Sequence, residues 1–234
     1  MQNIELCFFH IEKCIGSSLR NILYNYLKHI YKDTDIFLPS HKNGERNLTA
    51  KTDVLFFKDQ LYKVVLCHCS FDHLNVTDDF SKSCFSITCI RHPINRLISH
   101  YYYFDYSSTK LKIHELSNDI LKQLIINYGR VMLMRLSGHT LDVNIAKYNI
   151  SNNINCIMIF ENFENDLKSL NNLLNTKYNV NIAMENVKIN ENKINYSEWV
   201  DNDIAKINEH LHLIEDIELY NYAINLDKDV RFKL

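Results

Sequence analysis

Four residues near the start of the chain have the types and spacing of an anion-binding turn: Lys13, Gly16, Ser17 and Ser18. They join an apolar run to a helical pattern, which places them between a strand and a helix. Such a turn presents free backbone N–H groups and the positive end of the helix dipole, which together bind phosphate or sulfate. Gly16 would let the backbone approach the ligand, the serines would donate hydrogen bonds, and Lys13 would add positive charge.

The position of the lysine separates this turn from the common nucleotide-binding loop. That loop reads G-x-x-x-x-G-K-[ST], with the lysine directly after a glycine. Here Lys13 comes three residues before Gly16, so we expect it to approach the ligand from the strand side. The alternative is a plain capped helix start, and in either case Ser17 or Ser18 is the expected N-cap.

A second candidate anion site follows the apolar run at 84–90. Arg91 comes directly after this run, and Ser99 lies eight residues later, about two helical turns further on. An arginine in that position can make a bidentate contact with a phosphate, and Ser99 could hold another oxygen of the same group. Two separate anion sites suit a nucleotide with separated phosphates. The alternative is that Arg91 pairs with a carboxylate and Ser99 faces solvent.

The elements that must position these residues alternate along the chain. Short apolar runs predict buried strands at 4–9, 53–57, 62–68, 84–90 and 155–160. Helical periodicity predicts helices at 17–31, 94–106, 114–127, 129–137, 163–175 and 201–225, and the polar segment 32–52 is predicted as a loop. The alternation indicates an α/β fold of one domain over 1–234, with a parallel sheet covered on both faces. Ligands in such folds bind beyond the carboxyl ends of the strands, where we expect His10, His68, Arg91 and Glu161.

The composition is that of an ordinary globular protein. Of the 234 residues, 46% are apolar and 23% are charged, and the formal net charge of −2 argues against a general nucleic-acid binder. The seven cysteines lack a second ligand pair at zinc spacing, so we expect no metal site and reduced, buried thiols. No apolar run reaches the length of a membrane span and no signal peptide is recognisable, which predicts a soluble cytoplasmic protein, bacterial or viral in a host cytoplasm.

Two stretches together resemble the cofactor motifs of sulfotransferases that use 3′-phosphoadenosine-5′-phosphosulfate (PAPS). "FFHIEKCIGSSLRNIL" (8–23) is similar to their 5′-phosphosulfate loop, H-I-P-K-T-G-G-T-S-L, and "IRHPINRLISHYYYF" (90–104) to their 3′-phosphate motif, R-D-P-x-x-R-L-x-S-x-Y. The tyrosine run resembles the heparan and uronyl 2-O branch, and vaguer similarities at 159–174 and 214–226 extend the resemblance over most of the chain. The resemblance implies a P-loop-like three-layer sandwich.

Several residues depart from the family motifs. Glu12 stands where the loop usually has proline, Cys14 replaces a threonine, Ile15 replaces the first glycine, and His92 replaces an aspartate. Ile15 bears on the backbone shape of the loop and therefore on cofactor affinity. The other motif residues match: Lys13, Gly16, Ser17, Ser18, Arg91, Pro93, Arg96 and Ser99.

The resemblance also implies roles for the matching residues. Lys13 would neutralise the oxygen between sulfate and 5′-phosphate, Gly16, Ser17, Ser18 and the loop amides would hold the 5′-phosphate, and Arg91 and Ser99 the 3′-phosphate. His68, in "VVLCHCSFDHL", matches the histidine of a G-H-x-x-[FY] segment that acts as general base, with His10 and His73 as the next candidates. No metal is needed, because the lysine and the helix end carry the countercharge. Arg20, Arg96 and Glu161 are expected to be structural.

The sequence therefore predicts an enzyme that transfers a sulfuryl group from PAPS to a hydroxyl of a carbohydrate acceptor. Three alternatives stay open: a catalytically inactive nucleotide- or glycan-binding module on the same fold, a sulfotransferase for tyrosine or small molecules, and a phosphotransferase. A phosphotransferase would need carboxylates that hold Mg²⁺, and no such strand end stands out. The 2-O branch carries another histidine two residues before the base, where this chain has Leu66.

Overall fold

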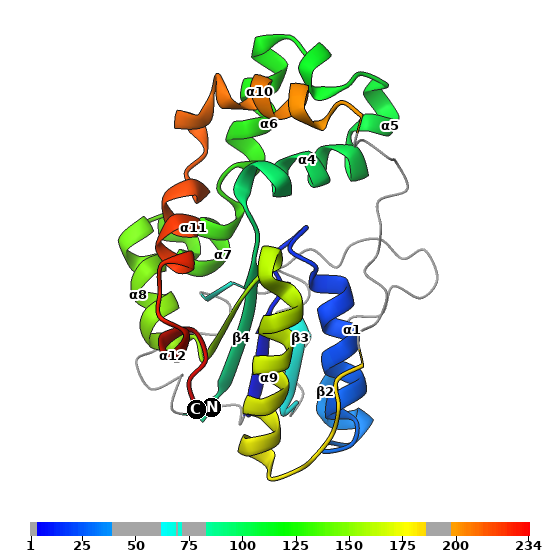
Figure 1. The fold of residues 1–234 in the computed structure, drawn as a ribbon, viewed down its shortest axis with the longest axis vertical. Helices are drawn as coiled ribbons and strands as arrows, with labels where there is room; N and C mark the ends of the chain where they lie inside the picture. The colour runs from blue at the N-terminus through cyan, green and yellow to red at the C-terminus, as the bar shows by residue number, and fades with distance from the viewer. Residues whose placement is uncertain (1–3, 39–61, 69, 72–82, 186–197) are drawn as a thin grey trace.

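The computed structural model describes residues 4–38, 62–68, 70–71, 83–185 and 198–234 (Figure 1). Within these ranges, parallel strands form one sheet in the order β2-β3-β1-β4-β5. The strands are β1 (Leu6–Phe9), β2 (Ile36–Phe37), β3 (Val64–Cys67), β4 (Phe85–Ile90) and β5 (Cys156–Ile159). The predicted α/β fold with a central parallel sheet is confirmed, and its middle strand is β1.

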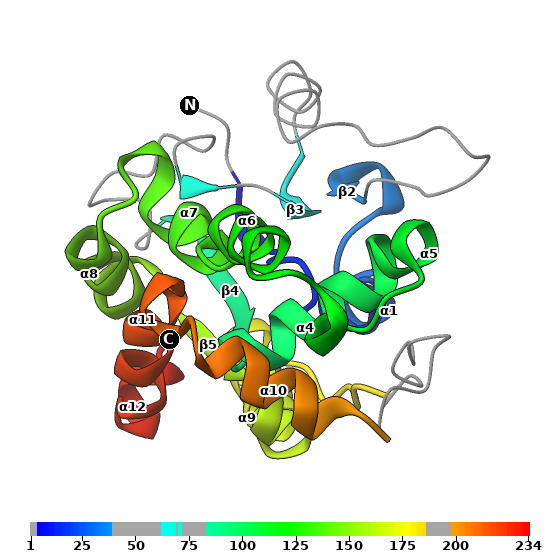
Figure 2. The same ribbon diagram turned by 90° about the horizontal axis from the view of Figure 1, so that it is seen from above.

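Both faces of the sheet are covered by helices, as the unbroken apolar runs predict (Figures 1 and 2). Alternate residues of β1 point to opposite faces, so Leu6 and Phe8 join one apolar cluster while Cys7 and Phe9 join another. The first cluster includes side chains of α1 (Gly16–Leu27) and α9 (Phe163–Tyr178). The second includes side chains of α7 (Val131–Ser137), α8 (Val143–Asn153) and α11 (Asp216–Ile224).

A third apolar cluster lies beyond the carboxyl ends of the strands, at the top of Figure 1. It joins α4 (Pro93–Phe104), α6 (Asn118–Tyr128) and α10 (Val200–Asn208). Short helices α5 (Tyr106–Thr109) and α12 (Lys228–Arg231) complete the described helices. None of the helices in the described ranges has the length and apolar character that crossing a membrane requires.

Two sequence expectations about strands have different outcomes. Residues 32–52 are not all loop, because Ile36 and Phe37 pair with Val64 and Val65 as an edge strand. The stretch is only two residues long, too short to give a periodic signal. The predicted strand 53–57 lies outside the described residues.

The predicted long helix 201–225 is wrong. The chain instead forms α10, a 3₁₀ turn at Leu211–Leu213, and then α11. The break places Asp216 where its buried carboxylate accepts hydrogen bonds from the backbone N–H groups of Met132 and Leu133, at 3.0 and 2.8 Å. Helix α8 was not predicted, because its asparagine-rich sequence has only a weak apolar face. Its start is fixed by Asp142, whose side chain accepts from the N–H groups of Asn144 and Ile145.

Candidate functional site

The loop between β1 and α1 has an unusual backbone. Lys13 and Ile15 both have left-handed φ angles, 64° and 59°. This region is disfavoured for residues with a side chain, and for a β-branched residue such as isoleucine it is an outlier. Ile15 is the N-cap of α1, so the expectation that Ser17 or Ser18 is the N-cap is wrong. Both serines lie in the first helical turn, Ser17 partly buried and Ser18 buried.

Gly16 begins α1 and packs against a histidine ring. A Cβ atom on Gly16 would lie 1.6 Å from Cδ2 and 1.7 Å from Nε2 of His10. No side chain fits there unless the histidine moves, and His10 is itself buried at the end of β1. The close approach that requires glycine is therefore made by His10.

Lys13 points its charged end toward α4. Its Nζ lies 3.8 Å from the centroid of the Tyr103 ring, a cation–π contact. No carboxylate within the described ranges pairs with it. Burial, and then the positive charge of Arg91, lower the pKa of Lys13 to about 8. The ammonium group is thus held at a place that favours an incoming anion.

Arg91 follows β4 and lies beside the loop. Its Nη1 donates to the carbonyl oxygen of Lys13 at 3.2 Å, and its guanidinium carbon lies 4.2 Å from the centroid of the Phe160 ring. Its Nε is buried and has no hydrogen-bond partner among the residues described. In the same part of the chain no carboxylate pairs with Arg91, so the alternative of a structural ion pair finds no support there.

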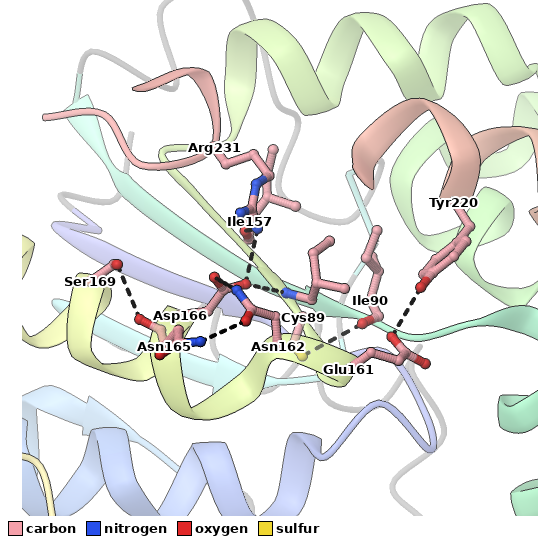
Figure 3. Close-up of polar contacts among 11 residues, drawn as sticks. Cys89, Ile90, Ile157, Glu161, Asn162, Asn165, Asp166, Ser169, Tyr220 and Arg231 are labelled. Carbon is pink, nitrogen blue, oxygen red and sulfur yellow. Dashed lines mark hydrogen bonds and ion pairs between the residues drawn. The ribbon is translucent and has the colours of Figure 1, made fainter. Parts of the chain in front are cut away.

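Ser99 and Glu161 occupy the surroundings of Arg91. Ser99 is buried on α4, which excludes the alternative that it faces solvent. The carboxylate of Glu161 accepts a hydrogen bond from the backbone N–H of His92 at 2.9 Å. It also accepts one from the hydroxyl of Tyr220 at 3.2 Å (Figure 3). Glu161 therefore fixes the backbone next to Arg91, which agrees with the structural role expected for it.

Arg96 is fully buried inside the fold. Its Nη2 donates to the carbonyl oxygen of Tyr128 and lies 3.4 Å from a carboxylate oxygen of Asp216. Burial raises the pKa of Asp216 to about 6, against the opposing effects of Arg96 and of two backbone hydrogen bonds. Arg96 thus joins α4 to α11, the structural role expected from the sequence.

His68 lies just past the end of β3, next to the loop. Its Nδ1 lies 3.0 Å from the carbonyl oxygen of His10, and the two imidazole rings stack with centroids 3.7 Å apart. Burial lowers the pKa of His68, although the nearby carboxylate of Glu12 opposes the shift, so the ring is neutral near pH 7. A carbonyl oxygen only accepts, so Nδ1 carries the proton. Nε2 is then an unprotonated nitrogen, the form that a general base needs.

One ion pair at this site, between Glu12 and Arg135, was not predicted from the sequence. Glu12 receives two hydrogen bonds from the guanidinium of Arg135 on α7, one of them from Nε at 3.3 Å. The signal for Glu12 was its place in the loop, where a charged residue stands instead of proline. Arg135 gave no signal, because it lies 123 positions further along the chain.

The structure therefore brings most of the candidate residues to one edge of the sheet. Lys13, Gly16, Ser17 and Ser18 belong to the loop and first turn after β1, Arg91 follows β4, and His68 follows β3. Among the residues described, no hydrogen bond joins Ser99 to Arg91. His73, named as another candidate base, lies outside the described residues.

Comparison with known proteins identifies the family of the chain. A search of curated proteins gives no match. A sequence model described as "Sulfotransferase family" matches residues 2–223, which include every candidate residue named above. Because this match covers nearly the whole chain, the chain belongs to the sulfotransferase family of enzymes.

Proposed function

We propose that the chain transfers a sulfuryl group from PAPS to a hydroxyl of a carbohydrate acceptor, with His68 as general base. The observation that carries the proposal is a pair of cations, Lys13 and Arg91, that have no carboxylate partner in the described ranges. They meet through the 3.2 Å hydrogen bond at the ends of β1 and β4. Members of the family generally use PAPS as sulfate donor.

The residues present fit an anionic donor. The buried Arg91 Nε has no hydrogen-bond partner among the residues described, and α1 begins at Gly16 with its first N–H groups directed toward the same loop. We assign the 5′-phosphosulfate to Lys13, Gly16, Ser17 and Ser18, and the 3′-phosphate to Arg91 and Ser99. This division places one phosphate on each of two neighbouring strand ends.

The chemistry is an in-line displacement at sulfur. His68 Nε2 takes the proton of the acceptor hydroxyl as the acceptor oxygen bonds to sulfur. Lys13 neutralises the charge that grows on the bridging oxygen as the bond from that oxygen to sulfur breaks. The products are the sulfate ester and adenosine bisphosphate, and His68 then returns its proton to solvent. Positioning and electrostatic stabilisation supply most of the catalysis in such a step.

An exposed aromatic pair supports a carbohydrate acceptor. Tyr103 and Phe104 are 61% and 54% exposed, and their rings contact each other edge to face with centroids 4.6 Å apart. Tyr103 also touches the Lys13 ammonium, so the pair borders the place where transfer occurs. The C–H groups on one face of a sugar ring pack well against aromatic rings, which cost little entropy to order. The 2-O class of sugar acceptor is the one that the sequence motifs favour.

Calorimetric titration with 3′,5′-adenosine bisphosphate tests the donor site. We expect tight binding that weakens roughly 10- to 100-fold in Lys13→Ala and in Arg91→Ala, because each removes a charge-assisted contact. Lys147→Ala is the matched control, since Lys147 pairs with Glu218 on the exposed surface. A preference for ATP with Mg²⁺ would instead favour a phosphotransferase, and binding of neither nucleotide would refute the proposal.

Radiolabelled PAPS with an acceptor panel tests the transfer. The panel contains desulfated heparan, desulfated chondroitin, a tyrosine peptide and a simple phenol. We expect label on a glycan, and a loss of ~10²–10⁴-fold in His68→Ala with bisphosphate affinity retained. Label on the peptide or the phenol would assign the alternative acceptors, and bisphosphate binding without any transfer would indicate an inactive binding module.

A further inference from the structure

The carboxylate of Glu12 lies between a buried arginine and the proposed base. Arg135 donates to both of its oxygens, from Nε and from Nη2. On the other side, Glu12 Oε1 lies 3.8 Å from Nδ1 of His68. The three side chains come from three different elements: Glu12 from the loop after β1, His68 from the end of β3, and Arg135 from α7.

The arginine is the most buried of the three side chains. The Arg135 side chain is only 9% exposed, while those of Glu12 and His68 are 29% and 30% exposed. Burial would raise the pKa of Glu12, but the charge and hydrogen bonds of Arg135 outweigh it and hold that pKa below its ordinary value. Glu12 is therefore ionised in the folded protein near neutral pH. A two-bond arginine contact also fixes the plane of the carboxylate.

We propose that Glu12, fixed by Arg135, is a positioning residue for His68: it keeps Nδ1 turned toward the protein and stabilises the imidazolium that forms during transfer. The proposal rests on the proposed function, because it needs His68 as the base. When Nε2 accepts the acceptor proton, His68 becomes positive 3.8 Å from a carboxylate. An opposite charge at that distance favours the charged ring.

Other charged groups around His68 act in the opposite sense. Arg20 of α1 and Arg135 both disfavour the imidazolium, whereas the backbone carbonyl oxygen of His10, which accepts a hydrogen bond from Nδ1, favours it. Without Glu12, the ring would face two guanidinium groups and no anion within the described part of the chain. The negative charge of Glu12 therefore offsets the positive charge that His68 acquires when it is protonated.

The same ion pair also anchors the donor loop. Glu12 directly precedes Lys13, the first of the two left-handed residues. A proline at this position would restrict the backbone by its ring. Here the contact with Arg135 restrains the loop from outside, through α7. In this proposal the ion pair between Glu12 and Arg135 restrains both His68 and Lys13.

Measurement of the His68 titration by NMR of the imidazole resonances tests the proposal without an acceptor. We expect the pKa of His68 to fall in Glu12→Gln, where an anion is lost, and to rise in Arg135→Gln, where a cation is lost. Glu218→Gln is the matched control, because it removes an exposed carboxylate from an ion pair elsewhere, and it should leave the titration unchanged. A purely structural role of the ion pair would not give opposite shifts.

The second measurement is the pH profile of kcat/KM with whichever acceptor the panel identifies. In Glu12→Gln the acidic limb should move to lower pH and the plateau should fall roughly tenfold, since a weaker base transfers the proton less well. Shifts of the His68 pKa in the same direction in both variants, or no shift in either, would overturn the proposal. If His68→Ala keeps full activity while the opposite shifts are seen, the coupling stands and the choice of base fails.

Discussion

The imidazole rings of His10 and His68 are stacked with centroids 3.7 Å apart and planes 25° from parallel. The same His10 ring occupies the space beside Gly16 where a Cβ would otherwise lie. His10 is therefore a spacer between the proposed base and the first residue of α1. A side chain added at Gly16 would therefore displace the ring that stacks on His68.

Substitution of Gly16 by alanine should both destabilise the fold and disturb the site. The added Cβ would lie 1.6 Å from His10 Cδ2, so the buried ring must move. We expect a loss of ~1–3 kcal/mol in the free energy of unfolding, measured in urea, because overpacked groups force such shifts. Ser17→Ala, in the same turn, is the control and should cost less. Equal stability of Gly16→Ala and wild type would contradict the packing seen here.

At position 15 a glycine variant should be more stable than an alanine variant, the reverse of the usual order inside a helix. Both variants lose the same buried side chain, but only glycine adopts a φ of 59° without strain. Ile15→Gly should therefore be more stable than Ile15→Ala by ~1 kcal/mol. At Ile22, buried inside α1, the order should be the ordinary one, with alanine more stable by ~1 kcal/mol. The denaturant midpoints of the four variants test this prediction. If alanine is the more stable residue at both positions, the backbone of Ile15 is not strained.

Bisphosphate affinity should depend on pH through Lys13. Burial and the charge of Arg91 place the pKa of this lysine at about 8, so it is charged below that pH and loses its charge as pH rises through it. Calorimetric affinity should therefore fall between about pH 7 and pH 9.5, where the nucleotide phosphates no longer titrate. Lys13→Arg keeps its charge throughout and should flatten this dependence. A parallel decline in the arginine variant would assign the effect to another group.

His100 should make the fold sensitive to acid. Burial, followed by the charges of Arg96 and Lys13, lowers its pKa from 6.5 to about 4. Between these values the unfolded chain binds a proton that the native state does not, so stability falls as pH drops through this window. The loss should reach ~2–3 kcal/mol. His100→Phe keeps an aromatic ring against Tyr128 and should lose less stability between pH 6.5 and 4 than wild type, measured by urea unfolding.

Substitution of Phe104 should weaken acceptor binding and leave donor binding unchanged. It is exposed and contacts Tyr103, which in turn touches Lys13. Phe104→Ala should raise the acceptor KM roughly tenfold, since loss of an aromatic contact of this kind costs ~0.5–1.5 kcal/mol beyond its buried area. Bisphosphate affinity should not change. Ile120→Ala, at an exposed apolar residue of α6, is the control. An unchanged KM for Phe104→Ala would remove the aromatic pair from the acceptor site.

Local sequence patterns predicted much of the fold and brought most candidate site residues to the same end of the sheet. Runs such as "CFSITCI" at 84–90 are buried on both faces, so their apolar character alone identified a parallel sheet. The ends of these runs located His68 and Arg91, because sheet topology brings carboxyl ends together. Strand β2 was missed because two residues give no period.

Features that depend on distant contacts could not be predicted in this way. Ile15 has a left-handed backbone although isoleucine disfavours this conformation, so local preference predicts the opposite of what is found. The break between α10 and α11 exists because Asp216 bonds the start of α7, more than 80 residues earlier in the chain. The contact between Glu12 and Arg135 is of the same kind. The sequence around Glu12 gives no indication that Arg135 is its partner, and the reverse is also true.

The place of β1 in the middle of the sheet separates the proposed base from Arg91. Its neighbours are β3, which ends at the proposed base, and β4, which ends at Arg91. Adjacent strands lie about 4.8 Å apart, so base and arginine leave the sheet roughly 10 Å apart with the loop of Lys13 between them. In the proposed reaction the acceptor would therefore enter beside β3, and the 3′-phosphate of the donor would bind beside β4, on opposite sides of the loop. The order of the strands thus sets the spacing between the proposed base and the proposed 3′-phosphate contact.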